Sequence, residues 1–242
     1  MCLKNKTALL TGASGGIGRE IALSLAEMGA NIILFGGSNL KNLQETAFAV
    51  SEKGVRVQFF AGDLTDEKFI LENFELAVKQ FGGLDVLINN AGVAFNAGFD
   101  KTPLDVFDKI LNINARAPFI IIQQALPYLK KSDRASVINI ASIVAHSGYP
   151  YQSAYTASKH ALLGLTKSLA NEVYKDDIRV HAISPGGVYT DMVKISRPDL
   201  TGEGMISPKE IADIVEFLLK NRGNAVIDEI IVHRIGKEPF LV

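Results

Sequence analysis

Cysteine is almost absent from this chain of 242 residues, in which Cys2 is the only one. A single cysteine excludes an intramolecular disulfide, which fits a reducing compartment, and the cytoplasm is the simplest expectation. The chain also lacks any uncharged apolar run of about 18 residues. Its opening, MCLKNKTALL, leads directly into a strand-like segment without a small-residue cleavage site. We therefore expect neither a membrane span nor a secretion signal.

Neither sign of charge is in excess, because 25 Lys and Arg residues balance 26 Asp and Glu residues. A formal net charge of −1 creates no field that would concentrate nucleic acid or anionic lipid, so we expect neither as a general partner. Any phosphate group must be bound locally by a few residues. The four histidines have no spacing typical of a metal site, and we expect no metal.

No stretch rich in Pro, Gly or Ser divides the chain, so a single domain covering residues 1–242 is expected. Short apolar runs alternate with helical patterns, and repeated strand–helix units favour parallel strands joined by helical crossovers. The strand-like runs are continuously apolar, so helices should cover both faces of the sheet. The sequence predicts an α/β fold, a three-layer, doubly wound sheet of about seven parallel strands. Helical patterns span residues 17–29, 40–53, 66–81, 103–130, 153–175 and 207–221.

Residues 186–206, GGVYTDMVKISRPDLTGEGMI, are the least regular part of the chain and follow the sixth strand-like run. Ligands of open parallel sheets bind beyond the carboxyl ends of the strands. We therefore expect this segment to be a small lid over the substrate.

A glycine-rich turn, TGASGGIG over residues 11–18, connects the first strand-like run to the first helix. Gly12 permits a tight turn, Gly16 lets the backbone approach a pyrophosphate, and Gly18 lets the helix pack closely on the sheet. The N–H groups and the dipole of that helix attract phosphates. Glycines in loops are often simple turn formers, but the position between strand and helix favours a dinucleotide site. The residues expected to bind it are Gly12, Ser14, Gly15, Gly16, Ile17 and Gly18.

The end of the second strand-like run reads FGGSN and contains no acidic residue. A carboxylate there would bind the free ribose 2′-hydroxyl of NAD and repel the 2′-phosphate of NADP. Ser38 and Asn39 can donate hydrogen bonds to that phosphate, and Lys41 and Arg19 are candidate cations for it. These residues favour NADP, with NAD as the alternative.

Asp63 and Leu64 lie in the motif GDLTD, after the third strand-like run. The Asp63 carboxylate can accept a hydrogen bond from the adenine amino group. It can equally cap the next helix, a role that residues 65–66 would also serve. The sequence leaves both interpretations open.

Asn90, Ala91 and Gly92 follow the fourth strand-like run in the motif NNAG. Small residues there let the backbone approach the adenosine ribose, although the motif is also typical of a turn that ends a strand. Because it belongs to the same sheet edge as the glycine-rich turn, we favour the cofactor interpretation.

Tyr155 and Lys159 are four residues apart in a predicted helix, which places both side chains on one face. A tyrosine near its reference pKa of about 10 is a poor base at neutral pH. An ammonium about 4 Å away contributes roughly 1 kcal/mol in water but about 4 kcal/mol at an effective dielectric near 20. Only a sheltered pocket would thus let Lys159 lower the pKa of Tyr155 substantially.

Ser142 ends the fifth strand-like run, where its hydroxyl can hold the same substrate oxygen as Tyr155. A surface Tyr–Lys pair and a capping serine are the ordinary alternatives. Their shared position at the edge marked by the glycine-rich turn favours catalysis.

Together, TGASGGIG, NNAG, a serine thirteen residues before Tyr155, YTASK and PGGVYT resemble the short-chain dehydrogenase/reductase family. The resemblance covers nearly the whole chain and implies a Rossmann-like fold that moves a hydride between NAD(P) and a carbonyl or alcohol. It implies Tyr155 as the acid/base, Lys159 as the electrostatic partner that holds the nicotinamide ribose, and Ser142 as the substrate-orienting group. It also implies that Asn114 holds a water in a proton relay to Lys159.

The resemblance extends to the segment after the sixth strand-like run, which it implies binds the nicotinamide carboxamide and a phosphate. The residues alone indicate only a strand-ending turn there, and Asn114 alone would be an ordinary polar residue of the helix at 103–130. Family members usually assemble as homodimers or homotetramers through the helices that correspond to 103–130 and 153–175. The residues of the nicotinamide segment are Pro185, Gly186, Val188 and Thr190.

Within the family the core resembles 3-oxoacyl-(acyl-carrier-protein) reductases, but the end, AVIDEIIVHRIGKEPFLV, departs from their usual ITG and VDGG pattern. The substrate therefore stays open. Candidates for lining its pocket are His146, Ser147, Tyr149, Tyr151 and Gln152, although tyrosines there can equally be packing residues. A non-catalytic dinucleotide sensor or scaffold is one rival function, and an epimerase or dehydratase is another. The complete set of four family residues favours an NADP-preferring carbonyl reductase or alcohol dehydrogenase acting on a small molecule.

Overall fold

The computed structural model of the chain describes residues 2–196 and 201–238. Its sheet has seven strands in the order β3-β2-β1-β4-β5-β6-β7, and each neighbouring pair is parallel. The predicted doubly wound sheet is confirmed, with its switch point between β1 and β4. The strands are β1 (Thr7–Thr11), β2 (Asn31–Gly36), β3 (Val57–Ala61), β4 (Val86–Asn89), β5 (Ser136–Ile140), β6 (Arg179–Pro185) and β7 (Glu229–Val232).

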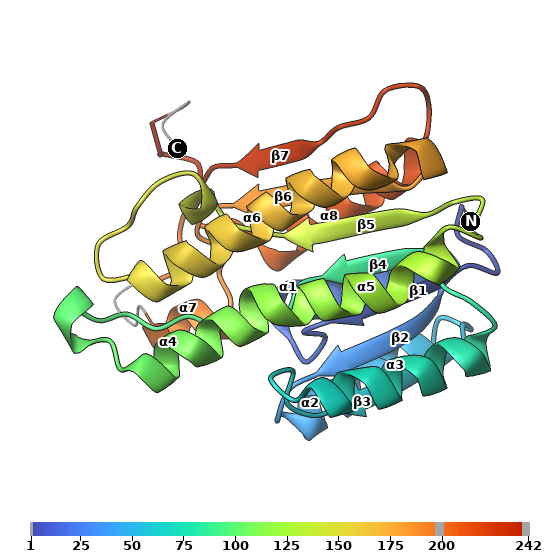
Figure 1. Cartoon of the computed structure of the whole chain (residues 1–242), viewed down its shortest axis with the longest axis horizontal. Coiled ribbons are helices and arrows are strands. Elements are labelled where there is room, and N and C mark those ends of the chain that lie inside the picture. Colours follow the sequence, from blue (N-terminus) through green and yellow to red (C-terminus); the bar gives the residue numbers. More distant parts are fainter. Residues whose placement is uncertain (1, 197–200, 239–242) are drawn as a thin grey trace.

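Helices cover both faces of the sheet (Figure 1). The helices α1, α2 and α8 pack on one face, and α3, α5 and α6 pack on the other. Apart from the segment at 103–130, the predicted helices are confirmed to within two residues at each end. The helices are α1 (Gly16–Glu27), α2 (Leu40–Ser51), α3 (Glu67–Phe81), α4 (Leu104–Leu111), α5 (Ala117–Leu129), α6 (Ser153–Val173), α7 (Asp191–Ser196) and α8 (Pro208–Lys220).

Side chains of each inner strand alternate between two separate cores. In β1, Leu9 packs with α3 and α5, whereas Ala8 and Leu10 pack with α1 and α8. This two-sided burial explains the continuously apolar runs. The edge strands β3 and β7 differ, because several of their residues are partly or fully exposed. The expectation that helices cover both faces therefore holds fully only for the inner strands.

The helix predicted at 103–130 is not continuous. A π-helical turn over Asn112–Arg116 separates α4 from α5. Pro118, near the start of α5, has no N–H to donate to the carbonyl of Asn114 four residues earlier, and its ring crowds that carbonyl. The irregular turn therefore has a local cause in the sequence. π turns of this kind are frequent at functional sites.

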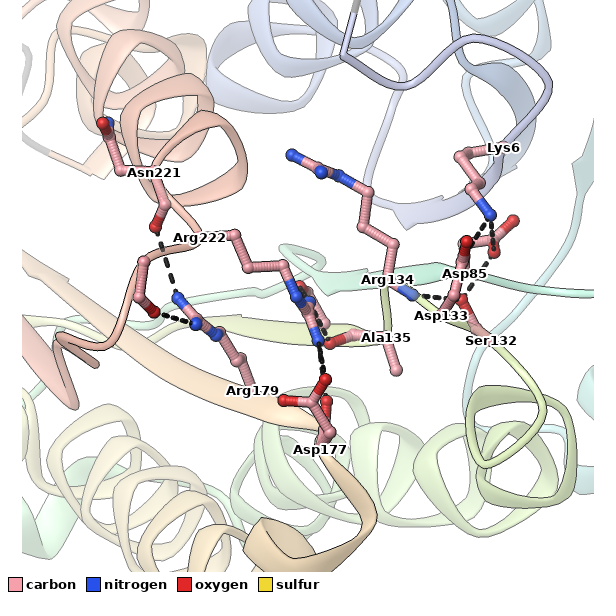
Figure 2. Close-up of polar contacts among 12 residues, drawn as sticks. Lys6, Asp85, Ser132, Asp133, Arg134, Ala135, Asp177, Arg179, Asn221 and Arg222 are labelled. Atoms are coloured by element: carbon pink, nitrogen blue, oxygen red, sulfur yellow. Dashed lines mark hydrogen bonds and ion pairs between the residues drawn. The ribbon is translucent and has the colours of Figure 1, made fainter.

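Polar contacts fix the loops at the amino ends of β5 and β6 (Figure 2). Arg222, which follows α8, donates hydrogen bonds to the carbonyl oxygens of Ala135 at 2.8 Å and Asp177 at 2.7 Å. Arg179, the first residue of β6, donates to the carbonyl oxygen of Asn221 at 3.3 Å. These bonds tie this edge of the sheet to the end of α8, which leaves the carboxyl edge for ligand-binding loops.

In the described part of the chain, no helix combines the length and the apolar character needed to cross a membrane. The same residues contain no group of three or more His, Cys, Asp or Glu side chains that could hold a metal ion.

Candidate active site

A cavity of about 940 Å³ opens at the carboxyl edge of the sheet, toward which the strand arrowheads of Figure 1 point. Cavities of roughly 300–1,000 Å³ are typical of small-molecule and cofactor sites. Four predicted residues, Ser38, Asp63, Leu64 and Asn114, do not line it. The predicted residues that do are Gly12, Ser14, Gly15, Gly16, Ile17, Gly18, Asn39, Asn90, Ala91, Gly92, Ser142, Tyr155, Lys159, Pro185, Gly186, Val188 and Thr190.

The glycine-rich turn is tightly packed against the loop after β4. Gly12 has a φ of 71°, and a Cβ there would lie 2.7 Å from the Cα of Ala91. A Cβ at Gly18 would lie 2.1 Å from the carbonyl oxygen of Gly12, so only glycine lets α1 pack this closely. The Asn90 amide donates to the carbonyl oxygens of Thr11 and Gly12, each at 3.1 Å. These two hydrogen bonds from Asn90 thus fix the conformation of the glycine-rich turn.

The same turn presents hydrogen-bonding groups that fit a pyrophosphate. Gly15 precedes α1 and provides no side-chain cap, so the first N–H groups of that helix have no side-chain acceptor. The hydroxyl of Ser14 is buried and has no hydrogen-bond partner among the described residues. Both features favour a bound anion at the positive end of the α1 dipole. The residues present therefore fit the phosphates of a dinucleotide.

The end of β2 is only partly directed at the cavity. Asn39 lines it, while its side-chain oxygen accepts a hydrogen bond from the N–H of Asn42 at 3.1 Å and caps α2. Its amide N–H₂ group is still available as a donor. Ser38, Lys41 and Arg19 are not part of the cavity wall.

Asp63 serves a local turn. Its carboxylate accepts a hydrogen bond from the N–H of Thr65 at 2.8 Å, and this bond holds the pKa of Asp63 below its ordinary value. The cap of α3 is Asp66, which accepts from two N–H groups of that helix. Leu64 is buried and packs in the core on the α3 and α5 side.

Ser142, Tyr155 and Lys159 meet on one wall of the cavity. Ser142 follows β5, and its hydroxyl donates to the carbonyl oxygen of Pro185 at 3.4 Å. Lys159 is buried, and its ammonium donates to the carbonyl oxygen of Ile140 at 2.7 Å. The Lys159 Nζ lies 5.8 Å from the centre of the Tyr155 ring. The predicted pairing of the two residues on one face of α6 is therefore confirmed in geometry.

Burial is the largest cause of the pKa shift of both Tyr155 and Lys159. It lowers the pKa of Lys159 to about 8, because the charged ammonium loses solvent. It raises the pKa of Tyr155, and a hydrogen bond with Ser142 acts in the opposite direction. The two groups are thus sheltered from solvent, and the Tyr155 pKa lies above its ordinary value. The Lys159 ammonium lies over the ring and is bonded to Ile140, and burial is the largest cause of the raised Tyr155 pKa.

Asn114 lies behind this wall, fully buried in the π turn. Its side-chain oxygen accepts from the N–H of Val93 at 2.8 Å, and its amide donates to the Val93 carbonyl oxygen and to the Ser158 hydroxyl, each at 2.9 Å. A Cβ at Gly92 would lie 3.4 Å from the Asn114 Oδ1 and 3.6 Å from the Lys159 Nζ. Gly92 thus keeps a space open between Asn114 and Lys159.

The segment after β6 closes one side of the cavity. Val188 forms a parallel bridge with Ile206, and the N–H of Tyr189 donates to the Ile206 carbonyl oxygen at 2.8 Å, so the two ends of the segment are joined. Thr190 reaches the glycine-rich turn, since a Cβ at Gly16 would lie 3.1 Å from its Cγ2. Residues 197–200 of the predicted lid at 186–206 lie outside the described residues.

The stretch after β7 also lines the cavity, through His233, Arg234 and Lys237, and none of these was among the predicted site residues. The sequence does contain a signal for them. Because β7 is parallel to β6, the residues that follow it must emerge at the carboxyl edge of the sheet.

The family of the chain follows from its match to a protein-family model. Residues 6–201 match the family model for short chain dehydrogenases, which is well over half of the chain. The chain belongs to this family. The predicted resemblance to the short-chain dehydrogenases is therefore confirmed.

Individual relatives of this short-chain dehydrogenase are similar over nearly its whole length. D-beta-hydroxybutyrate dehydrogenase from Rhizobium meliloti is 36% identical over 219 residues, covering 90% of this chain and 84% of that protein. A 3-oxoacyl-(acyl-carrier-protein) reductase from Thermotoga maritima is 32% identical over 240 residues, covering 96% and 97%.

Solved structures agree with the fold. An alcohol dehydrogenase from the archaeon Thermococcus sibiricus, complexed with 5-hydroxy-NADP, has a TM-score of 0.88 and 27% identity, covering 97% of this chain and 98% of that one. Carveol dehydrogenase from Mycobacterium avium, in complex with NAD, has a TM-score of 0.85 and 25% identity, covering 96% and 97%. Each of these two structures holds a nicotinamide dinucleotide or a derivative of one.

Proposed function

We propose that this short-chain dehydrogenase transfers a hydride between NADP(H) and the carbonyl or alcohol group of a small molecule. The observation that carries the proposal is the meeting of Ser142, Tyr155 and Lys159 on one cavity wall. The glycine-rich turn, which fits the phosphates of a dinucleotide, lines the same cavity. The arrangement thus joins a cofactor site to a proton donor.

In carbonyl reduction, the bound cofactor supplies the hydride to the carbonyl carbon. The Ser142 hydroxyl donates a hydrogen bond to the carbonyl oxygen and fixes its direction. The Tyr155 hydroxyl transfers its proton to that oxygen as negative charge develops there, which completes the alcohol. The Tyr155 phenol is protonated at neutral pH, the form that reduction requires, because its ordinary pKa is about 10 and burial raises it further.

The phenolate left on Tyr155 then needs a proton. Lys159 stabilises this phenolate electrostatically, and its pKa of about 8 suits proton exchange near neutral pH. We assign the return of the proton to a water in the space beside Gly92, between Asn114 and Lys159. The side chain of Asn114 is bonded to Val93 and Ser158, so its backbone carbonyl, deprived of a helical donor by Pro118, is the group assigned to that water.

The preference for NADP rests on the end of β2, where no carboxylate repels a 2′-phosphate. The Asn39 amide lines the cavity and is the donor assigned to that phosphate, with Ser38 beside it. NAD is the alternative cofactor. Asp63 and Leu64 lie beyond the cavity wall, and contact with the adenine would require the Asp63 carboxylate to be shared with Thr65.

We assign the nicotinamide to Pro185, Gly186, Val188 and Thr190, and the role of lid to residues 186–206, whose described ends are joined by the bridge between Val188 and Ile206. The proposal includes assembly as a homodimer or homotetramer. Phe99, Leu104 and Phe119, on and beside α4 and α5, are exposed by more than half of their surface, which supports contact with a second copy. Light scattering of the purified protein measures the assembly directly.

We place the enzyme in the cytoplasm because Cys2 is its only cysteine.

A dinucleotide sensor or scaffold without turnover is the rival function, since sensing needs only the cofactor cradle. The test is parallel titration with NADPH and NADH, followed by a panel of ketones, aldehydes, quinones and β-ketoesters, with absorbance of the nicotinamide as the readout. Tighter binding of NADPH, with its oxidation by a member of the panel, supports the proposal. Binding of both forms without oxidation by any carbonyl favours the sensor, and binding of neither contradicts both functions.

A further inference from the structure

Arg234 lies two residues after the end of β7 and lines the cavity. Its side chain passes over Gly187, where a Cβ would lie 3.2 Å from the Arg234 Cδ and 3.4 Å from its Nε. The same Cβ would lie 3.2 Å from the Cε of Met205, in the segment after β6. The Arg234 side chain therefore lies between the end of β6 and the proposed lid, and it is only partly exposed.

This position is on the Ser142 side of the cavity. A Cβ at Gly186 would lie 3.7 Å from the Cδ1 of Ile143, the neighbour of Ser142, and 3.8 Å from the backbone nitrogen of Arg234. The N–H of Gly186 donates to the carbonyl oxygen of Val232 at 2.8 Å, which fixes the stretch carrying Arg234 against the end of β6. The glycine-rich turn is reached by another part of the same segment, through Thr190. Arg234 thus lies on the part of the cavity wall that carries Ser142, the residue proposed to orient the substrate.

The guanidinium of Arg234 has no ion pair and no side-chain hydrogen bond with any residue in the ranges 2–196 and 201–238. Of the other charged groups that line the cavity, Lys159 is bonded to Ile140, and Asp191 is paired with Lys194 at 3.0 Å. Lys237 and Glu238, which also line the cavity, are exposed and carry opposite charges.

We infer that Arg234 binds a carboxylate of the substrate, so that the enzyme acts on oxo acids and the corresponding hydroxy acids. A guanidinium presents a planar fork of donors that matches a carboxylate with two parallel hydrogen bonds. The Arg234 side chain lies against Gly187, with Met205 close to the same position, in the wall of the cavity. This inference rests on the proposed function for the identity of the reacting group, but the anion site itself does not require turnover.

Binding without turnover tests the anion site by itself. Oxidised NADP cannot reduce a ketone, so calorimetry of the NADP-loaded enzyme measures the affinity of straight-chain 2-, 3- and 4-oxo acids and of their neutral methyl esters. We expect at least one acid to bind about tenfold or more tightly than its ester, and Arg234→Gln to remove that difference. Lys131→Gln, which removes an exposed cation before β5 at the opposite sheet edge, is the charge-matched control and should leave it unchanged.

Three results would overturn the inference. One is equal binding of acid and ester by the native enzyme at all three spacings, and another is equal loss of both ligands in Arg234→Gln. A weakened affinity for NADP itself in that variant would also overturn it, because it would place Arg234 on the cofactor. Unchanged NADP affinity shows in addition that the variant is folded.

Turnover separates this inference from the proposed function. If the native enzyme oxidises NADPH with the acid and Arg234→Gln raises KM for the acid but not for the ester, both stand. If acids bind through Arg234 and no carbonyl is ever reduced, the proposed function fails and the anion site stands. If neutral ketones are reduced and no acid is preferred, the inference fails and the proposed function stands.

Discussion

The Nζ of Lys159 lies 5.8 Å from the centre of the Tyr155 ring and donates a 2.7 Å hydrogen bond to the carbonyl oxygen of Ile140, at the end of β5. The sheet edge itself therefore fixes the position of the ammonium. Because Lys159 is almost fully buried, its charge is held away from solvent and next to the phenol that it is proposed to assist.

The burial of Lys159 predicts a specific pH dependence of stability. Its pKa is about 8 in the folded chain and near 10.5 when unfolded, so between these values the unfolded state binds more protons. The free energy of unfolding should thus rise with pH across this window, and the cost of burying the charge should be fully present below pH 8. We expect wild type to gain on the order of 3 kcal/mol relative to Lys159→Met between pH 7 and 11.

Urea denaturation of both proteins without cofactor measures this gain. Comparison with the variant cancels the titration of other groups. A constant difference in stability over the whole range would show that Lys159 keeps its ordinary pKa.

Two glycines of the same turn should respond differently to alanine. A Cβ at Gly18 meets the carbonyl oxygen of Gly12 at 2.1 Å, so Gly18→Ala must displace α1 from the sheet. At Gly15 no atom lies within 4 Å of the Cβ position, and its φ of 165° is extended backbone that alanine can adopt. We expect Gly18→Ala to lower the melting temperature and to weaken dinucleotide binding at least about tenfold, as a 1.4 kcal/mol loss would.

Gly15→Ala is the control, and its melting temperature should stay near that of wild type. Differential scanning fluorimetry with and without NADPH gives both readouts. Equal melting temperatures for the two variants would contradict the close packing of α1 at Gly18.

The space beside Gly92 allows a test of the proton relay. Gly92→Ala places a methyl group 3.4 Å from the Asn114 Oδ1 and 3.6 Å from the Lys159 Nζ, distances of ordinary contact that leave the fold intact. If a water there returns the proton to Tyr155, kcat should fall about tenfold or more, within the usual contribution of acid–base catalysis. The melting temperature should change little.

Steady-state kinetics at several pH values checks this prediction, with the affinity for NADPH as its control. A normal kcat in Gly92→Ala would remove the relay from this space. A loss confined to NADPH affinity would instead assign Gly92 to cofactor binding.

Much of this site could be predicted because its chemistry depends on short-range patterns. The glycine-rich turn, Ser142 at a strand end, and the four-residue spacing from Tyr155 to Lys159 each position their groups through one local element. Parallel strands then bring those elements to one edge. The sequence therefore predicted the cavity wall and the layer order of the fold.

Other features depend on contacts that no local pattern contains. The π turn at Asn114 had a visible cause in Pro118, but helical periodicity runs through both residues and concealed it. The raised pKa of Tyr155 follows from three-dimensional burial, which sequence spacing does not measure. Arg234 was missed because its place in the cavity depends on the parallel pairing of β7, a short and partly exposed edge strand.

Replacement of Tyr155 by phenylalanine tests the central claim most directly. The Tyr155→Phe variant loses the transferable proton and keeps the ring that packs near Lys159, so dinucleotide binding should stay within about twofold of wild type. Turnover of any carbonyl that wild type reduces should fall by about 10²-fold or more. Rates near wild type in a variant that binds NADPH normally would contradict the assignment of Tyr155 as the proton donor.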